Sequence, residues 1–200
     1  VLVAAVDLLI VFIGLEMMSL ALYMMIAISH EQKLSKEAAL KYFILGSFAS
    51  AIFLYGIAFL FGTVGSTYIP QIIEATGDLI STNRMFLFGI TMLIVGFCFK
   101  VSIAPFHAWT PDVYQGAPTS VTAFFAIVPK VAAMGLIMRL LFGPLASVSG
   151  QWDQIIWFLS AASMVVGAFA AIVQENIKRL LAYSSIGNMG YALVGIAAVS

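Results

Sequence analysis

Four charged side chains lie inside long apolar runs. Glu16 stands in Phe-Ile-Gly-Leu-Glu-Met-Met, Lys100 in Phe-Cys-Phe-Lys-Val and Lys130 in Val-Pro-Lys-Val. Lys41 stands in Ala-Leu-Lys-Tyr-Phe, nearer the start of its run. A charge at the centre of a bilayer costs at least about 2.5–3.5 kcal/mol, so such residues normally pair with one another or line a hydrated route for ions.

The chemistry that these residue types offer is proton transfer. Desolvation disfavours the charged form of a lysine, so a buried lysine gives up its proton more readily than one in water. We therefore predict that Lys100 and Lys130 carry protons. No acidic residue lies near either lysine in the sequence, so the structural alternative, an ion pair that only holds helices together, needs a partner from elsewhere in the fold.

The other candidates leave alternatives open. Glu16 and Lys41 could form a buried ion pair that joins two helices, and such a pair can also act as a switch. Lys41 could instead extend its ammonium group to water at the membrane surface. His107 could shuttle protons, because histidine titrates near neutrality, or it could belong to an interfacial linker in which Trp109 and Tyr114 are aromatic anchors.

The composition indicates that lipid surrounds these runs. Of the 200 residues, 62% are hydrophobic and 9% are charged, whereas a typical soluble domain has about 25% charged residues. The formal net charge is zero, so we expect the lipid bilayer and not nucleic acid as a partner. The sequence holds no Cys/His cluster and no glycine-rich phosphate loop, so it predicts neither a metal site nor a nucleotide site.

Six stretches reach the length of a spanning helix, about 20 apolar residues. They are about 7–28, 38–62, 84–104, 119–142, 153–173 and 179–200. Continuous apolar runs such as 85–99 exclude the alternating segments of a β-barrel. The sequence therefore predicts an all-α, polytopic transmembrane bundle that forms one proton-translocating domain over residues 1–200. Because apolar runs reach both ends, we expect this chain to be a fragment of a longer membrane protein.

Two further patterns concern orientation and helix breaks. The first and fifth connections each hold two basic residues, which predicts that the loops after helices one, three and five are cytoplasmic. Pro105 should loosen the third helix just after Lys100, and Pro129 should do the same in the fourth, freeing the carbonyl of Phe125 beside Lys130. Freed backbone groups are tolerated where they line a wet cavity, although prolines are also simply common in transmembrane helices.

A long motif around Lys100 resembles a known family. It begins at residue 99 and reads Phe-Lys-Val-Ser-Ile-Ala-Pro-Phe-His-Ala-Trp-Thr-Pro-Asp-Val-Tyr-Gln-Gly-Ala-Pro-Thr-Ser-Val-Thr-Ala-Phe, followed by Val-Pro-Lys. A second motif reads Gln-Glu-Asn-Ile-Lys-Arg-Leu-Leu-Ala-Tyr-Ser-Ser-Ile-Gly. Over essentially the whole chain, the sequence resembles the antiporter-like membrane subunits of respiratory complex I, the proton-pumping NADH:quinone oxidoreductase. The Pro-Asp-Val-Tyr motif is most similar to that of the subunit N branch, the relative of mitochondrial subunit 2.

The resemblance implies a mechanism. Glu16 and Lys41 would form the pair that biases Lys100, and Lys130 would relay the proton onward. The helices would belong to inverted five-helix repeats with broken helices at the midplane, here most of the first repeat and the opening of the second. The chain would be a non-redox subunit of a translocase in the bacterial inner membrane. Its partners would be the other membrane subunits of complex I, and NADH, flavin, iron–sulfur clusters and quinone would lie in partner subunits, with no cofactor in this chain.

Two departures and three alternatives accompany this interpretation. Ser120 stands where the family commonly has proline, and Asn188 stands where many members have histidine, which puts a polar relay at that point in doubt. A monovalent cation/proton antiporter subunit is the main alternative, and the Pro-Asp-Val-Tyr motif argues against it. A passive structural subunit is another. An enzyme with its own active site is least favoured, because no nucleophile–base constellation or cofactor motif is present.

Overall fold

The computed structural model describes residues 2–29, 31–143 and 149–198, and the regular secondary structure of these ranges is α-helical apart from one isolated β-bridge. Its helices are α1 (Leu8–Ala27), α2 (Lys33–Val64), α3 (Ile69–Thr82), α4 (Arg84–Val101), α5 (Thr110–Gly116), α6 (Thr119–Phe142), α7 (Ser149–Ile172) and α8 (Ile177–Ala197). All but α3 and α5 are long and apolar enough to span a membrane. The expected all-α, polytopic bundle is confirmed.

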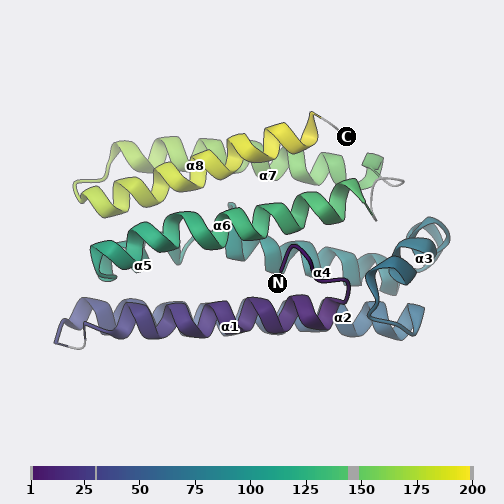
Figure 1. Cartoon of the computed structure of the whole chain (residues 1–200). Helices are drawn as coiled ribbons and strands as arrows, with labels where there is room; N and C mark the ends of the chain where they lie inside the picture. Colours follow the sequence, from purple (N-terminus) through teal and green to yellow (C-terminus); the bar gives the residue numbers. More distant parts are fainter. Residues whose placement is uncertain (1, 30, 144–148, 199–200) are drawn as a thin grey trace.

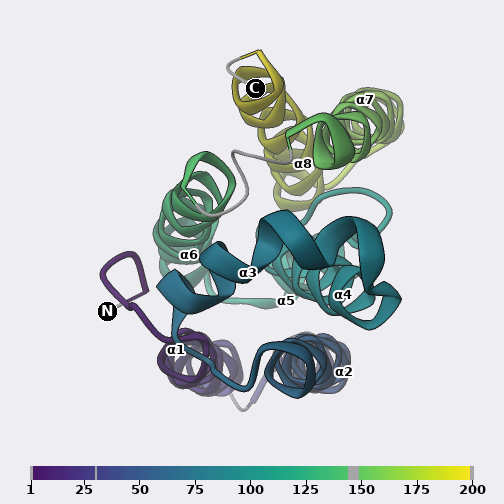
Figure 2. The same cartoon turned by 90° about the vertical axis from the view of Figure 1, so that its right-hand side faces the viewer.

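The long helices run roughly along one axis and stack in layers (Figure 1). The view along that axis shows α1 and α2 on one side, α4 and α6 in the middle, and the α7–α8 hairpin on the other side (Figure 2). The α1–α2 loop, α5 and the α7–α8 loop lie at one end of the bundle, and α3 lies at the opposite end (Figure 1). The bundle therefore has two chemically distinct ends.

Polar residues at three helix starts fix where the spanning segments begin. Asp7 accepts a hydrogen bond from the Leu9 backbone N–H at 2.8 Å, and Asn83 accepts one from Met85 at 2.9 Å. Asn176 does the same at the start of α8. These side chains satisfy backbone donors that have no partner in the first turn of a helix.

Two helices were not expected. The segment between the predicted spans 38–62 and 84–104 is mostly filled by α3, which buries an apolar face through Ile69, Ile72 and Ile80. The short α5 lies in the segment interpreted as a polar linker. In addition, α2 begins at Lys33, five residues before the predicted start at 38.

The prolines act differently in α4 and α6. The expected interruption near Pro105 is confirmed: α4 ends at Val101, Ser102 adopts a left-handed conformation with φ of 64°, and the Ala104–Pro105 peptide is cis. No helix break accompanies Pro129, because α6 continues as a helix through this residue, and the freed Phe125 carbonyl stays a prediction. A proline removes one hydrogen bond from the ladder, and the bonds of adjacent turns keep α6 helical.

Candidate functional site

The side chains of Lys100 on α4 and Glu16 on α1 approach each other inside the bundle. The Lys100 side chain is buried, with 7% of the residue exposed, and its Nζ lies 3.7 Å from Glu16 Oε1. It donates a hydrogen bond of 2.7 Å to Ser19 Oγ, one turn after Glu16. Ser50 of α2 donates to Glu16 Oε1. The partner that Lys100 needed is thus a carboxylate from α1, supported by two hydroxyl groups.

The predicted Glu16–Lys41 ion pair is not formed. Lys41 Nζ instead lies 2.7 Å from Glu37 Oε1 and 2.8 Å from Asp112 Oδ2, and 43% of its side chain is exposed. The reason is the position along α2, since the α2 residue that contacts Glu16 is Ser50. Nine residues separate Lys41 from Ser50, about 13 Å along a helix. The Lys41 side chain therefore extends to the end of the bundle. This agrees with the alternative in which its ammonium group reaches the membrane surface.

Lys130 occupies a second buried site between α5, α6 and α8. Only 2% of the residue is exposed. Its Nζ donates to Ser185 Oγ at 2.6 Å and lies 5.6 Å from the centre of the Tyr114 ring, within reach for a cation–π interaction. Among the described residues, its polar contacts are thus with a hydroxyl and an aromatic ring, whereas Lys100 has a carboxylate.

The segment between α4 and α5, together with α5 itself, carries polar atoms that are buried without protein partners. In the described part of the chain these include Ser102 Oγ, His107 Nδ1, Thr110 Oγ1 and the Tyr114 hydroxyl. Buried polar groups normally have a hydrogen-bond partner, and ordered water commonly supplies it. Burial also lowers the pKa of His107 below its ordinary value of 6.5, so the ring is neutral at pH 7 and can accept a proton.

Aromatic packing holds this segment in place and rules out the interfacial role considered for two of its residues. Trp109 and Tyr114 are both almost fully buried. The Trp109 ring stacks on the Tyr42 ring with 4.7 Å between the ring centroids. The Nε1–H of Trp109 donates to the Phe99 carbonyl at 3.1 Å. The Tyr114 ring packs on the ring of Phe125 of α6, with 5.8 Å between the ring centroids. These rings are internal and keep the broken end of α4 next to α2 and α6.

Sequence reasoning missed a polar network at the end of the bundle. Asp112 of α5 accepts hydrogen bonds from Lys41 of α2 at 2.8 Å and from Arg179 of α8 at 2.5 Å. Burial alone would raise the pKa of Asp112, but these two bonds outweigh it and hold the pKa below the ordinary value. The partners are 71 and 67 residues away, so no local pattern pointed to the network.

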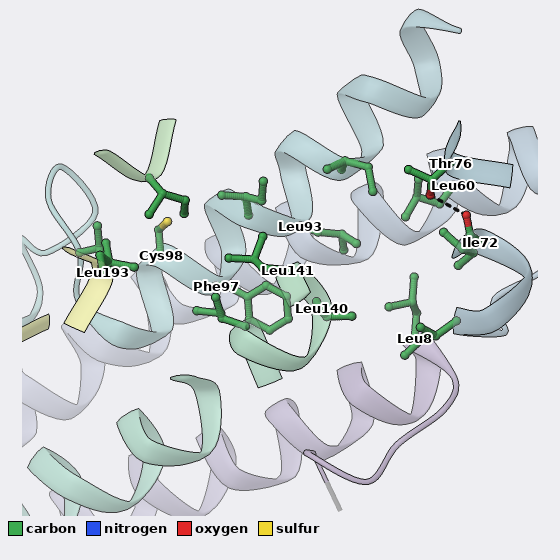
Figure 3. A pocket seen from close by; sticks show the side chains of 16 residues that line it. Leu8, Leu60, Ile72, Thr76, Leu93, Phe97, Cys98, Leu140, Leu141 and Leu193 are labelled. Carbon is green, nitrogen blue, oxygen red and sulfur yellow. Dashed lines mark hydrogen bonds between the residues drawn. The ribbon is translucent and has the colours of Figure 1, made fainter. Parts of the chain in front are cut away.

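A separate apolar cavity lies toward the α3 end of the bundle (Figure 3). It encloses about 60 Å³ and is lined by 16 residues, Phe97 and Cys98 of α4 among them. The hydroxyl of Thr76, the one polar side-chain group of the lining, already donates to the Ile72 carbonyl at 2.7 Å. An apolar cavity of this kind stays dry. The buried polar atoms between the lysines thus lie toward one end of the bundle, and a dry space lies toward the other.

The fold and these side chains define a class: a multi-pass helical membrane protein with two lysines buried in its bundle, one of them held by a carboxylate. Residues 5–200 match the family model described as NADH:quinone oxidoreductase/Mrp antiporter, transmembrane. The chain belongs to this family, and the resemblance seen in its motifs is confirmed.

Relatives place the chain more narrowly. It is 60% identical over 196 residues to NADH-quinone oxidoreductase subunit N of Bdellovibrio bacteriovorus, covering 98% of this chain and 40% of that protein. A chain of respiratory complex I from Thermus thermophilus is 39% identical with a TM-score of 0.81, covering 98% of this chain and 41% of that one. A chain of the Mrp complex from a Dietzia species, 23% identical with a TM-score of 0.86 over 96% of this chain and 35% of that one, shares the fold. The chain spans about 40% of the length of the curated relatives it matches.

Proposed function

We propose that this chain belongs to a proton-translocating subunit N of an NADH:quinone oxidoreductase and moves protons without redox chemistry of its own. The observation that carries the proposal is the buried Lys100, whose Nζ lies 3.7 Å from Glu16 Oε1 and donates to Ser19. A lysine whose charged form depends on one carboxylate can be switched by a change at that carboxylate.

The size of this interaction suits a switch. Two unit charges 3.7 Å apart interact by about 4 kcal/mol at an effective dielectric constant near 20. Moving one charge through 100 mV requires about 2.3 kcal/mol. Neutralising or displacing Glu16 therefore changes the free energy of the Lys100 ammonium by an amount comparable to that which the transfer of one proton requires.

The route from Lys100 leads along the broken segment toward Lys130. Ser102, His107 and Thr110 offer buried polar atoms that protein groups leave unsatisfied, and waters bridging them would form a path. Lys130 receives the proton next to Ser185 and passes it toward helices of the longer subunit. The apolar cavity toward the α3 end disfavours water on that side, which supports a water path through the broken segment.

The surroundings of the chain follow from the same proposal. We place it in a bacterial inner membrane, with the α1–α2, α4–α6 and α7–α8 connections on the cytoplasmic side. Their common position at one end of the bundle and the basic residues Lys33, Lys36, Lys178 and Arg179 there support this orientation. Other membrane subunits of complex I would be its partners. NADH, flavin, iron–sulfur clusters and quinone would be bound by partner subunits.

The test is Lys100→Ala in the full-length subunit. NADH oxidation and NADH-driven proton uptake are measured side by side in membrane vesicles, and assembly is checked on a native gel. We expect an assembled complex in which both activities fall together. The matched control is Lys36→Ala, which removes an exposed lysine and should leave both activities unchanged.

Two results would redirect the assignment. Wild-type activities in an assembled Lys100→Ala complex would refute the role of Lys100 and favour a structural subunit. Because the family description also covers Mrp antiporters, proton uptake that requires sodium and persists without NADH would instead identify a cation/proton antiporter.

A further inference from the structure

The short helix α5 is fastened to its neighbours by polar contacts on two sides. Ser35 of α2 donates to the Gly116 carbonyl at 2.7 Å. Lys178 of α8 donates to the Ala117 carbonyl, just after α5, also at 2.7 Å. The packing on α2 is so close that a Cβ at Gly116 would lie 2.5 Å from the Leu34 carbonyl oxygen. A helix of seven residues has little stability of its own, so these contacts determine where it lies.

Asp112 is the centre of this attachment because its two oxygens serve different helices. Oδ2 accepts from Lys41 of α2 at 2.8 Å, and Oδ1 accepts from Arg179 of α8 at 2.5 Å. Arg179 also donates to Gln115 of α5 at 3.1 Å. Removing one carboxylate would thus weaken the attachment of α5 to both neighbours at once, although the Ser35, Lys178 and Gln115 contacts remain. An isolated exposed ion pair contributes little, but a shared carboxylate with several donors forms a network.

The same two helices supply both polar neighbours of Lys130. Tyr114, whose ring faces the Lys130 ammonium, lies on α5 two residues after Asp112. Ser185, which accepts from Lys130, lies on α8 six residues after Arg179. The attachment of α5 to α8 therefore sets the positions of the ring and the hydroxyl relative to each other.

The packing of the hairpin strengthens this connection. Among the described helices, the backbone of α8 lies closer to α5 than to α6, while Ile156 of α7 and Leu193 of α8 pack into the core shared with α4 and α6. Figure 2 shows the hairpin on the outer side of the bundle, away from α1 and α2. Lys130 is on α6, so the helix that carries it does little to hold Ser185 in place. The α5–α8 contact holds the end of α8 that carries Arg179, and the Ala104 N–H, which donates to Ser163 Oγ of α7 at 2.9 Å, holds the other helix of the hairpin.

We propose that Asp112 and Arg179 are positioning residues for proton transfer at Lys130. Their ion pair fastens α5 to α8 and so holds Tyr114 and Ser185 around the Lys130 ammonium. Lys41 joins α2 to the same carboxylate, which gives this lysine a role other than partner of Glu16. We call the three side chains Lys41, Asp112 and Arg179 the clamp. The inference rests on the proposed function, since it assumes that protons pass through Lys130.

The first test is Asp112→Asn in the full-length subunit within the assembled complex. A displacement of about 1 Å at a reacting group can cost up to about 100-fold in rate, and we expect a loss of about tenfold in NADH-driven proton uptake. Asp112→Glu keeps the charge and should restore most of the rate. The matched control is Glu37→Gln, which removes the other carboxylate near Lys41 but leaves α5 attached to α8, and it should pump at the wild-type rate.

A second variant separates positioning from a general structural effect. Ser185→Ala removes only the hydroxyl that Asp112 and Arg179 are proposed to hold near Lys130. If the clamp acts through Ser185, the combined Asp112→Asn/Ser185→Ala loss will be smaller than the product of the single losses, because coupled sites are not additive. Losses that multiply would overturn the proposal.

The remaining outcomes are also decisive. If Asp112→Asn does not assemble, Arg179→Gln carries the same test, since it leaves the Lys41–Asp112 pair in place. Failure of both variants to assemble would mean that the clamp is needed only for folding, which refutes the positioning role. Full pumping by Lys130→Ala would refute the route through Lys130 itself. Impaired Lys130→Ala with unaffected Asp112→Asn would refute the clamp alone.

Discussion

The carboxylate of Glu16 is the single group whose removal should most affect Lys100. Glu16→Gln keeps the shape of the side chain and an oxygen for Ser50, but it removes the negative charge 3.7 Å from the lysine. The interaction lost is about 4 kcal/mol at an effective dielectric constant near 20. Ser19 Oγ still accepts from the Lys100 ammonium at 2.7 Å and offsets part of this loss, so about 2–3 kcal/mol is a realistic value.

A change of this size should be visible in turnover. Each 1.36 kcal/mol changes a rate or an equilibrium tenfold, so we expect proton uptake driven by NADH to fall by one to two orders of magnitude. NADH oxidation should fall with it, because the two processes are coupled. Glu16→Asp keeps the charge and should retain more activity than Glu16→Gln.

The assay uses vesicles from cells that express the full-length variant, with proton uptake and NADH oxidation recorded on the same preparation. Removing one partner of a buried pair can also destabilise a protein by about 3–5 kcal/mol, so the amount of assembled complex is quantified and the rates are normalised to it. Normalised rates equal to wild type in Glu16→Gln would refute the claim that Glu16 controls Lys100.

Three further outcomes follow from the packing and the charges. Leu93→Ala enlarges the dry cavity and should destabilise the subunit by about 2–5 kcal/mol; an unchanged thermal midpoint of the detergent-solubilised complex would contradict the packing of α4. Gly116→Ala places a methyl group 2.5 Å from the Leu34 carbonyl and should lower the yield of assembled complex, whereas Gly77→Ala, which meets no atom within 4 Å, should not. The lowered pKa of Asp112 contributes stability that is complete above the ordinary value of 3.8 and is lost as the pH falls through the folded-state value. The difference in thermal stability between wild type and Asp112→Asn should therefore shrink in acid, and a constant difference from pH 7 to pH 3 would argue against the ionised network.

Much of the fold was accessible from local sequence. All six spanning segments were found within a few residues of their observed limits, because bilayer thickness imposes a length that an apolar run reveals directly. The break after Lys100 was predictable from Pro105. Pro129 did not produce a helix break. The sequence shows that its N–H is missing, but whether the helix breaks there depends on the hydrogen bonds and packing of the neighbouring turns of α6.

The candidate residues divide in the same way. The sequence identified Lys100 and Lys130 as buried charges, and both are buried. The Glu16–Lys41 pair, which the residues left open and the family resemblance implied, does not form, because the choice between Lys41 and Lys100 depends on how far each lies along its helix relative to Glu16. That register is set by side-chain packing between helices and leaves no signal in either segment alone.

The sequence by itself determined that this protein spans a membrane and which segments span it. It also determined which lysines are costly to bury and to which family the chain belongs. These properties depend on the composition of continuous segments and on local motifs, which a linear reading captures. Only the tertiary structure decided that Glu16 contacts Lys100, that Asp112 joins α2 to α8, and that Ser185 accepts from Lys130. Each of these contacts joins residues between 55 and 84 positions apart, and folding brings them together through the packing of helices whose local sequences do not specify their neighbours.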